Sequence, residues 1–135
     1  MNFLKLSLIL MLAFTITACG DDDEGSDNSC VQSDWVGTYT GTETCDGDIY
    51  DVTVNVTASG TDAIVIAITE SDSTGTTTLT YDPIVPTGCT LSESGMDQGF
   101  TLSLIANLDE DVVTVSSTIG NGTVSETCIA TATRN

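Results

Sequence analysis

The 135-residue sequence contains no histidine and only two basic residues, Lys5 and Arg134. Without histidine, neither a Ser-His-Asp triad nor a Cys-His pair can form, so these nucleophilic mechanisms are excluded. Twenty acidic residues against two bases also exclude electrostatic binding to nucleic acid or to an anionic membrane surface. We therefore expect a protein that is not an enzyme, carries no cofactor and has no nucleic-acid partner.

Long apolar runs are also scarce, and the one that stands out covers residues 6–14, interrupted only by Ser7. It is too short to cross the hydrocarbon core of a bilayer, which is about 30 Å thick, and it follows a single positive charge at Lys5. Both features are typical of a signal peptide, which we place at residues 1–18. The sequence predicts no transmembrane helix after residue 19.

The signal ends in Ile16, Thr17, Ala18 and Cys19, which match the bacterial lipobox: an aliphatic residue, two small or β-branched residues, and cysteine. This resemblance implies that the Cys19 thiol receives a diacylglyceryl group and that cleavage removes residues 1–18. The membrane would then be a partner reached through the acyl chains on Cys19. Two or three chains hold a protein firmly, whereas one alone binds reversibly. Ordinary cleavage after Ala18, which would leave a free thiol, is the alternative.

Residues 19–29 contain no apolar side chain after the cysteine, so they cannot fold by burial and are expected to form a disordered acidic tether. The run Asp21, Asp22, Asp23 and Glu24 resembles the surface-export signal of Bacteroidetes-type lipoproteins. That resemblance implies an outer-membrane protein exposed on the cell surface, with a periplasm-facing anchor as the alternative. A plain spacer and a calcium site are the other interpretations, although the run lacks the alternate spacing of a calcium loop.

The chain after cleavage would be strongly acidic. It keeps Arg134 as its one base together with all 20 acidic residues, a net side-chain charge of −19. Such a chain stays soluble and repels its neighbours, so we expect a monomer.

Four cysteines remain besides Cys19, namely Cys30, Cys45, Cys89 and Cys128. An even number in an exported domain of this size predicts two disulfides, each stabilising by about 2–4 kcal/mol. Zinc binding is the alternative, but the chain has no CxxC spacing and no histidine. Three pairings are possible. If the strands alternate in direction, Cys30 and Cys89 lie at the same end of a barrel, which favours Cys30–Cys89 with Cys45–Cys128.

Residues 30–135 form a single domain that is rich in threonine, valine, isoleucine, serine and glycine and has no helical apolar stripe. Tyr50, Val52, Val54 and Val56 alternate with polar residues and give the clearest strand. Strands are predicted at residues 35–42, 50–57, 63–68, 76–81, 89–93, 100–104, 112–119 and 123–133.

The connections between these strands are short and contain clustered turn residues, as at 46–48, 59–62, 72–75 and 120–122. Short connections join only antiparallel neighbours, because a parallel crossover needs a dozen or more residues. Closing the sheet covers its apolar face and removes its edges. We therefore predict an all-β fold, an eight-stranded antiparallel up-and-down meander closed as a small barrel. A two-sheet β-sandwich is the alternative.

The first strand opens with Trp35, Gly37 and Tyr39, and this opening with a compact meander behind it resembles the lipocalin-like domains of bacterial lipoproteins. The resemblance covers residues 30–135 and implies a barrel that binds a small apolar ligand. An eight-stranded interior is wide enough to be filled by side chains or to hold one such ligand. A filled core, in a structural or accessory surface protein that acts through its exterior, is the alternative. The expected pocket residues are Tyr39, Tyr50, Val54, Ile66, Tyr81, Phe100 and Leu102.

Overall fold

The structure, a computed structural model, describes residues 29–135. The predicted signal peptide, Cys19 and all of the tether except Ser29 lie outside the described residues. No helix within residues 29–135 is long and apolar enough to cross a membrane. A short helix precedes eight strands: α1 (Gln32–Trp35), β1 (Gly37–Cys45), β2 (Asp48–Ser59), β3 (Ala63–Ser71), β4 (Thr76–Thr80), β5 (Thr90–Asp97), β6 (Phe100–Asp109), β7 (Val112–Gly120) and β8 (Ser125–Arg134).

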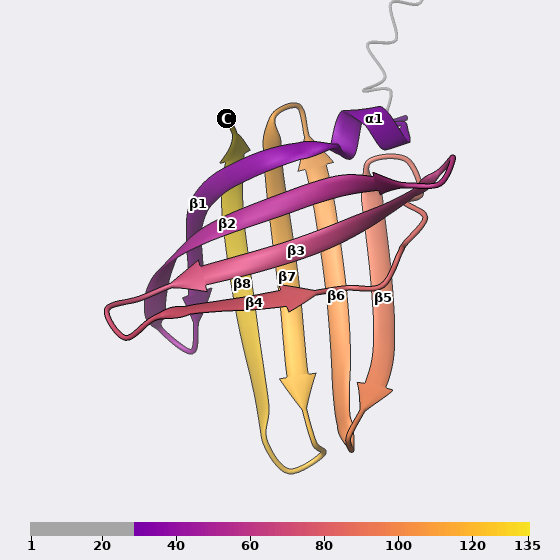
Figure 1. The fold of residues 1–135 in the computed structure, drawn as a ribbon. Coiled ribbons are helices and arrows are strands. Elements are labelled where there is room, and N and C mark those ends of the chain that lie inside the picture. The colour runs from indigo at the N-terminus through magenta and orange to yellow at the C-terminus, as the bar shows by residue number, and fades with distance from the viewer. Residues whose placement is uncertain (1–28) are drawn as a thin grey trace, which may run out of the picture.

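All eight strands belong to one antiparallel sheet with the order β4-β3-β2-β1-β8-β7-β6-β5. The predicted all-β meander is confirmed. The sheet curls strongly into a half-barrel, in which β1 pairs with β8 while β4 and β5 form the two edges. In Figure 1, strands β2–β4 cross over strands β5–β8, and the bent strand β1 joins the two layers.

The core lies between these layers and is built from side chains that recur at every second position of a strand. On β2 these are Val52, Val54 and Val56, and on β7 they are Val113 and Val115. Burial of each such side chain stabilises the fold by about 1.5–3 kcal/mol. The remaining buried core residues include Trp35, Tyr39, Ile64, Ile66, Ile68, Leu91, Leu104, Ala106, Leu108, Ala130 and Ala132.

Several strand boundaries differ from the prediction. Trp35, the predicted first residue of the first strand, is instead the last residue of α1, and the Asp34 carboxylate accepts a hydrogen bond from the Val31 N–H at 2.8 Å in the first turn of this helix. Trp35 is still fully buried, and its Nε1 donates to the Gly88 carbonyl at 3.0 Å. Strand β5 extends to Asp97, because pairing with β6 continues where the apolar alternation has faded.

Both disulfides of the favoured pairing, Cys30–Cys89 and Cys45–Cys128, are present in the structure. The first ties the segment before α1 to the segment between β4 and β5. The second joins directly facing residues of β1 and β8. The chain is thus cross-linked both at the start of the domain and at the central strand pair.

One end of the half-barrel is covered by α1, by residues 81–89 and by Arg134, and we call it the closed end. The Arg134 guanidinium donates to the carbonyl oxygens of Val36, at 2.7 Å, and Asp34. Its Nε lies 3.2 Å from Asp111 Oδ1, and its Cζ lies 5.0 Å from the centre of the Tyr39 ring. The only base in the described chain is therefore held at this end by two hydrogen bonds and one ion pair.

The central strands approach each other most closely at Gly41 in β1. A Cβ atom at this position would lie 2.0 Å from the carbonyl oxygen of Thr131 and 2.7 Å from Cα of Ala132, both in β8. These are backbone atoms and cannot move aside as a flexible side chain could. Only glycine therefore allows β1 and β8 to pair at this separation.

We predict that Gly41→Ala lowers the free energy of unfolding by about 1–3 kcal/mol, because the added methyl group forces the central strands apart. Gly95→Ala is a matched control in β5, where a Cβ would meet no atom within 4 Å. It should change stability by less than about 1 kcal/mol. Urea denaturation followed by Trp35 fluorescence measures both, and equal stabilities of the two variants would contradict the packing at Gly41.

Candidate functional site

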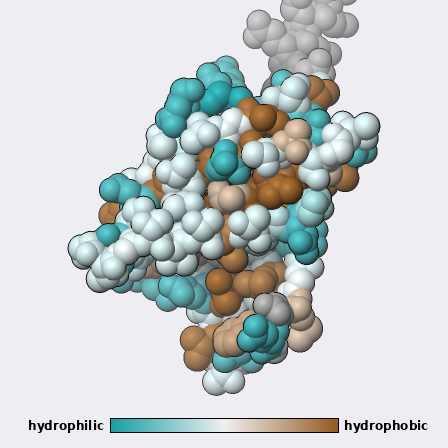
Figure 2. Space-filling model, viewed as in Figure 1, coloured by the Kyte–Doolittle hydropathy of each residue, from teal (hydrophilic) through white to brown (hydrophobic). Residues whose placement is uncertain are grey.

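The opposite end of the half-barrel carries a cavity of about 300 Å³ between the two layers. We call this cavity the open-end cleft and define it by the Cys45–Cys128 disulfide, Tyr50, Glu70, Leu79, Ile119 and Glu126. An adjoining hollow of about 280 Å³ shares Tyr50, Glu70 and Thr77 with it. In Figure 2, brown apolar atoms are visible in the hollow region below the threonine-rich strand β4.

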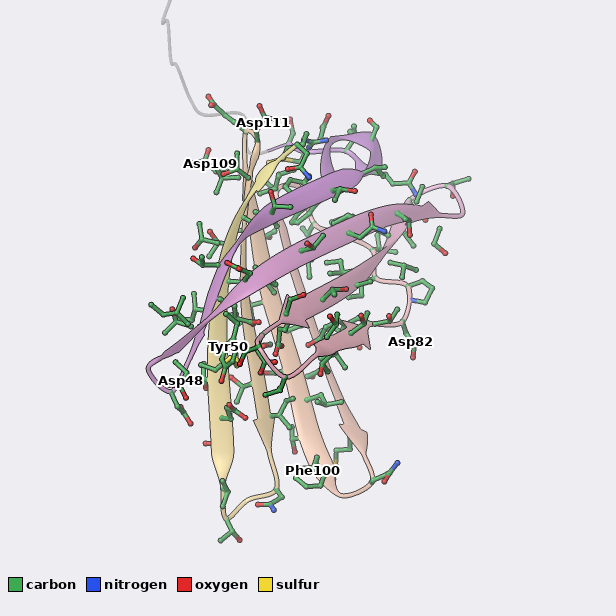
Figure 3. The ribbon with its side chains drawn as sticks, turned by 60° about the vertical axis from the view of Figure 1, so that its left-hand side comes forward. Asp48, Tyr50, Asp82, Phe100, Asp109 and Asp111 are labelled. Atoms are coloured by element: carbon green, nitrogen blue, oxygen red, sulfur yellow. A yellow bond between two sulfur atoms is a disulfide. The ribbon has the colours of Figure 1, made fainter. Side chains whose placement is uncertain are left out.

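The cleft exists because the two layers differ in length along this direction. Strand β4 has only five residues, of which Leu79 is the only apolar one, so it covers little of the opposite layer. The apolar inner faces of β6 and β7 nevertheless continue beyond it. Leu102 is half-buried, whereas the side chains of Ile119 and Phe100 are 39% and 44% exposed. Figure 3 shows Phe100 at the far end from Asp109 and Asp111 of the closed end.

A buried glutamate lies beside the cleft. Glu43 has the same inward orientation on β1 as Tyr39 and Cys45, and its side chain is only 1% exposed. Burial, followed by the negative charge of Glu70 and a hydrogen bond with its side chain, raises the pKa of Glu43 to about 7. The Glu43 Oε2 atom has no hydrogen-bond partner among the described residues.

Two tyrosines extend this group of polar side chains. Tyr50 on β2 faces Glu43 across the β1–β2 pair, and the negative charge of Asp48 is the main cause of its raised pKa. Tyr81, after β4, is half-buried against the core. Burial raises the pKa of Tyr81, and the charges of Glu43 and Glu70 raise it further. The phenol groups can donate hydrogen bonds, but neither supplies a positive charge.

A preformed metal centre is not supported by the donor atoms near Glu43. Donor atoms of Glu43, Cys45 and Cys128 lie within 4.8 Å of one another, but the two sulfur atoms form a disulfide. A metal ion is bound by the thiolate form of cysteine, which the disulfide removes. This group therefore offers one carboxylate only.

The expected pocket residues are divided between the core and the open end. Tyr39, Val54 and Ile66 are fully buried in the core, and the Tyr39 hydroxyl donates to the Trp35 carbonyl at 2.8 Å. Tyr81 packs against the same core. Among the residues at the open end are Tyr50, which lines the cleft, and Phe100 and Leu102, which continue its apolar face.

The sequence interpretation missed three acidic residues of this site, namely Glu43, Glu70 and Glu126. A signal for Glu43 was present, because it lies an even number of residues from Tyr39 and must share its inward face. Glu70 and Glu126 lie near strand ends, among many solvated acidic residues. Both are in phase with inward residues of their strands, Glu70 with Ile68 and Glu126 with Cys128, but alternation does not show that acids near strand ends belong to one site.

Comparison with solved structures supports the fold. The chain is similar to a redesigned β-barrel with a TM-score of 0.61 and 13% sequence identity, over 79% of this chain and 96% of that one. At this identity the likeness shows the fold alone. No family model and no curated protein matches the sequence. The described chain is thus a small β-barrel-like domain with two disulfides.

The raised pKa of Glu43 predicts a specific pH dependence of stability. Between the ordinary pKa of about 4.5 and about 7, the native state binds more protons than the unfolded state, so this contribution to stability is lost as the pH rises. We predict that Glu43→Gln is more stable than the wild type at pH 8, on the order of 1–3 kcal/mol, and nearly equal at pH 4.5. Urea denaturation across this range measures the difference.

The matched control is Glu110→Gln, which removes the same charge from an exposed residue at the closed end. Its stability should follow the wild-type curve with a small, nearly constant offset. If the free energy of unfolding varied with pH in the same way for the wild type, Glu43→Gln and Glu110→Gln, the result would contradict a buried Glu43 with a raised pKa.

Proposed function

We propose that the protein is a lipid-anchored outer-membrane lipoprotein whose β-domain binds a small, mainly apolar ligand in the open-end cleft. The observation that carries this proposal is the apolar inner face at Leu102 on β6 and Ile119 on β7, which continues past the cover of β4. Small-molecule sites are typically concave, about 300–1,000 Å³, and combine apolar walls with a few polar groups. The cleft fits this description, at the lower end of the size range. Its role in this proposal is binding, by a monomer, rather than catalysis.

The anchor is supported by the match of residues 16–19 to the lipobox and by the disulfides, which belong to an oxidising compartment. The described chain starts at the closed end, where Ser29 and Cys30 line a surface hollow together with Asp111 and Arg134. The tether therefore joins the domain at the closed end, and the open-end cleft lies at the other end of the half-barrel. The acidic run after Cys19 supports exposure on the cell surface.

A structural or accessory role through the exterior is the second candidate, and the outer face of the sheet favours it. Three exposed isoleucines, Ile49, Ile129 and Ile105, lie there in one row across the strands. Ile49 and Ile129 both pair with Thr44 of β1, which lies between them. Ile129 and Ile105 both pair with Ser116 of β7. Such a row offers apolar contacts to another envelope component. In this case the cleft would bind nothing.

The two candidates differ in the uptake of an apolar probe. We predict that the neutral fluorescent probe N-phenyl-1-naphthylamine binds the wild-type protein, and that Ile119→Asp weakens binding at least about tenfold by placing a charge in the cleft. Ile129→Asp, on the outer face, should leave probe binding unchanged. Fluorescence titration measures all three proteins. No uptake by the wild type would favour the exterior role.

The anchor is tested at Cys19. We predict that Cys19→Ser abolishes incorporation of radiolabelled palmitate and releases the protein into the soluble fraction, because no acyl chain remains to hold it. The wild type should stay in the outer-membrane fraction and be cleaved by protease added to intact cells. Membrane association of the Cys19→Ser variant would contradict the anchor, and protection of the wild type from protease would favour the periplasm-facing alternative.

A further inference from the structure

The charge balance around Glu43 is incomplete. Its carboxyl group is almost wholly buried, and Oε2 has no hydrogen-bond partner among the described residues. A buried polar atom without a partner costs free energy, and a buried carboxylate costs far more. The cost is removed either by a proton or by a cation that enters the site.

The described chain supplies no such cation. Arg134 is the only basic residue in residues 29–135, and it is bound at the closed end to Val36, Asp34 and Asp111. The charged groups that act on Glu43 from neighbouring strands are Glu70 on β3 and Glu126 on β8, and both are acidic.

The carboxyl group of Glu43 lies beside the wall of the open-end cleft, because one of its oxygens is within 4.8 Å of the sulfur atoms of Cys45 and Cys128, which line the cleft. It shares the inward face of β1 with Cys45, and the negative charge of Glu70, another residue that lines the cleft, acts on it. Glu126 contributes a third carboxylate from the opposite wall. The cleft is therefore lined by acids and hydroxyl groups together with the apolar side chains of Leu79 and Ile119 and the disulfide.

We propose that the open-end cleft binds a small organic ammonium ion, with its charged group at Glu43 Oε2 and Glu70 and its apolar body against Leu79 and Ile119. The inference rests on the proposed binding function and names the chemical class of the ligand. An ammonium group offers several N–H donors to carboxylates that accept only, and Tyr50, an aromatic residue of a type that attracts cations, also lines the cleft. The apolar wall and the single carboxylate among the close donor atoms favour this ligand over a metal ion.

The test compares n-hexylamine with 1-hexanol, which are similar in size and differ in charge. The protein is the mature chain, residues 19–135, carrying Cys19→Ser so that no detergent competes for the cleft. Isothermal titration calorimetry at pH 8 should give at least about tenfold tighter binding of the amine. The preference should shrink at pH 5.5, where Glu43 is protonated while the amine, like lysine with a pKa of about 10.4, keeps its charge.

Two variants assign the effect to Glu43. Glu43→Gln should lose the preference for the amine at pH 8 while its binding of 1-hexanol is retained, and it should show no dependence on pH between 5.5 and 8. Glu110→Gln removes an equal charge from an exposed position and should keep the full preference, which excludes general attraction to an acidic protein. Amine binding to the wild type near pH 7 should also release protons, since burial keeps part of the Glu43 population protonated there.

The outcomes separate the two proposals. Equal binding of hexylamine and 1-hexanol, or a preference that survives Glu43→Gln, overturns the ammonium site and leaves the apolar cleft intact. Failure of the wild type to bind either compound overturns the cleft function and the ammonium site with it. If calcium ions, added as the chloride, bound more tightly than hexylamine and Glu43→Gln abolished this binding, the site would be a metal site and the inference would be overturned.

Discussion

The close pairing of β1 with β8 is the constraint on which the rest of the structure depends. Gly41 permits the separation, and the Cys45–Cys128 disulfide fixes the facing positions near the end of the pair. This contact joins the first and last strands of the chain and makes them the centre of the sheet rather than its edges. The two edges therefore fall on β4 and β5, whose connection runs through residues 81–89 at the closed end.

This arrangement makes the two ends of the half-barrel unequal. At the closed end, α1, Trp35 and Arg134 supply apolar cover and hydrogen bonds, so the core there is sealed. At the open end, the short strand β4 stops before the opposite layer does, and no helix formed by residues 29–135 covers the difference. A curled sheet with one sealed end leaves space between its two layers at the other end. The position of the candidate site is thus a consequence of strand lengths as well as of side-chain chemistry.

Alternation along the strands was sufficient to predict the all-β meander and most of the core. It identified Val54 and Ile66 as inward residues because a period of two reports which face a side chain occupies. It gave Phe100 and Leu102 the same orientation. It could not show that these two side chains lie beyond the opposing layer, because the length of strands far away in the sequence decides whether that layer covers them. The helix at residues 32–35 was missed because a four-residue helix has no periodicity to detect.

Glu43 is the residue whose position conflicts most with the stability of the fold. An inward position on a central strand is where an apolar residue would stabilise the core, and a carboxyl group there costs free energy once it ionises. Proteins carry such local conflicts mainly at functional sites, where an interaction with a ligand compensates for them. The other buried polar side chain, Ser117, lies on the same cleft. Both of these buried polar side chains therefore lie at the open end of the half-barrel. The sheet that leaves this end uncovered also supplies the polar groups of the site.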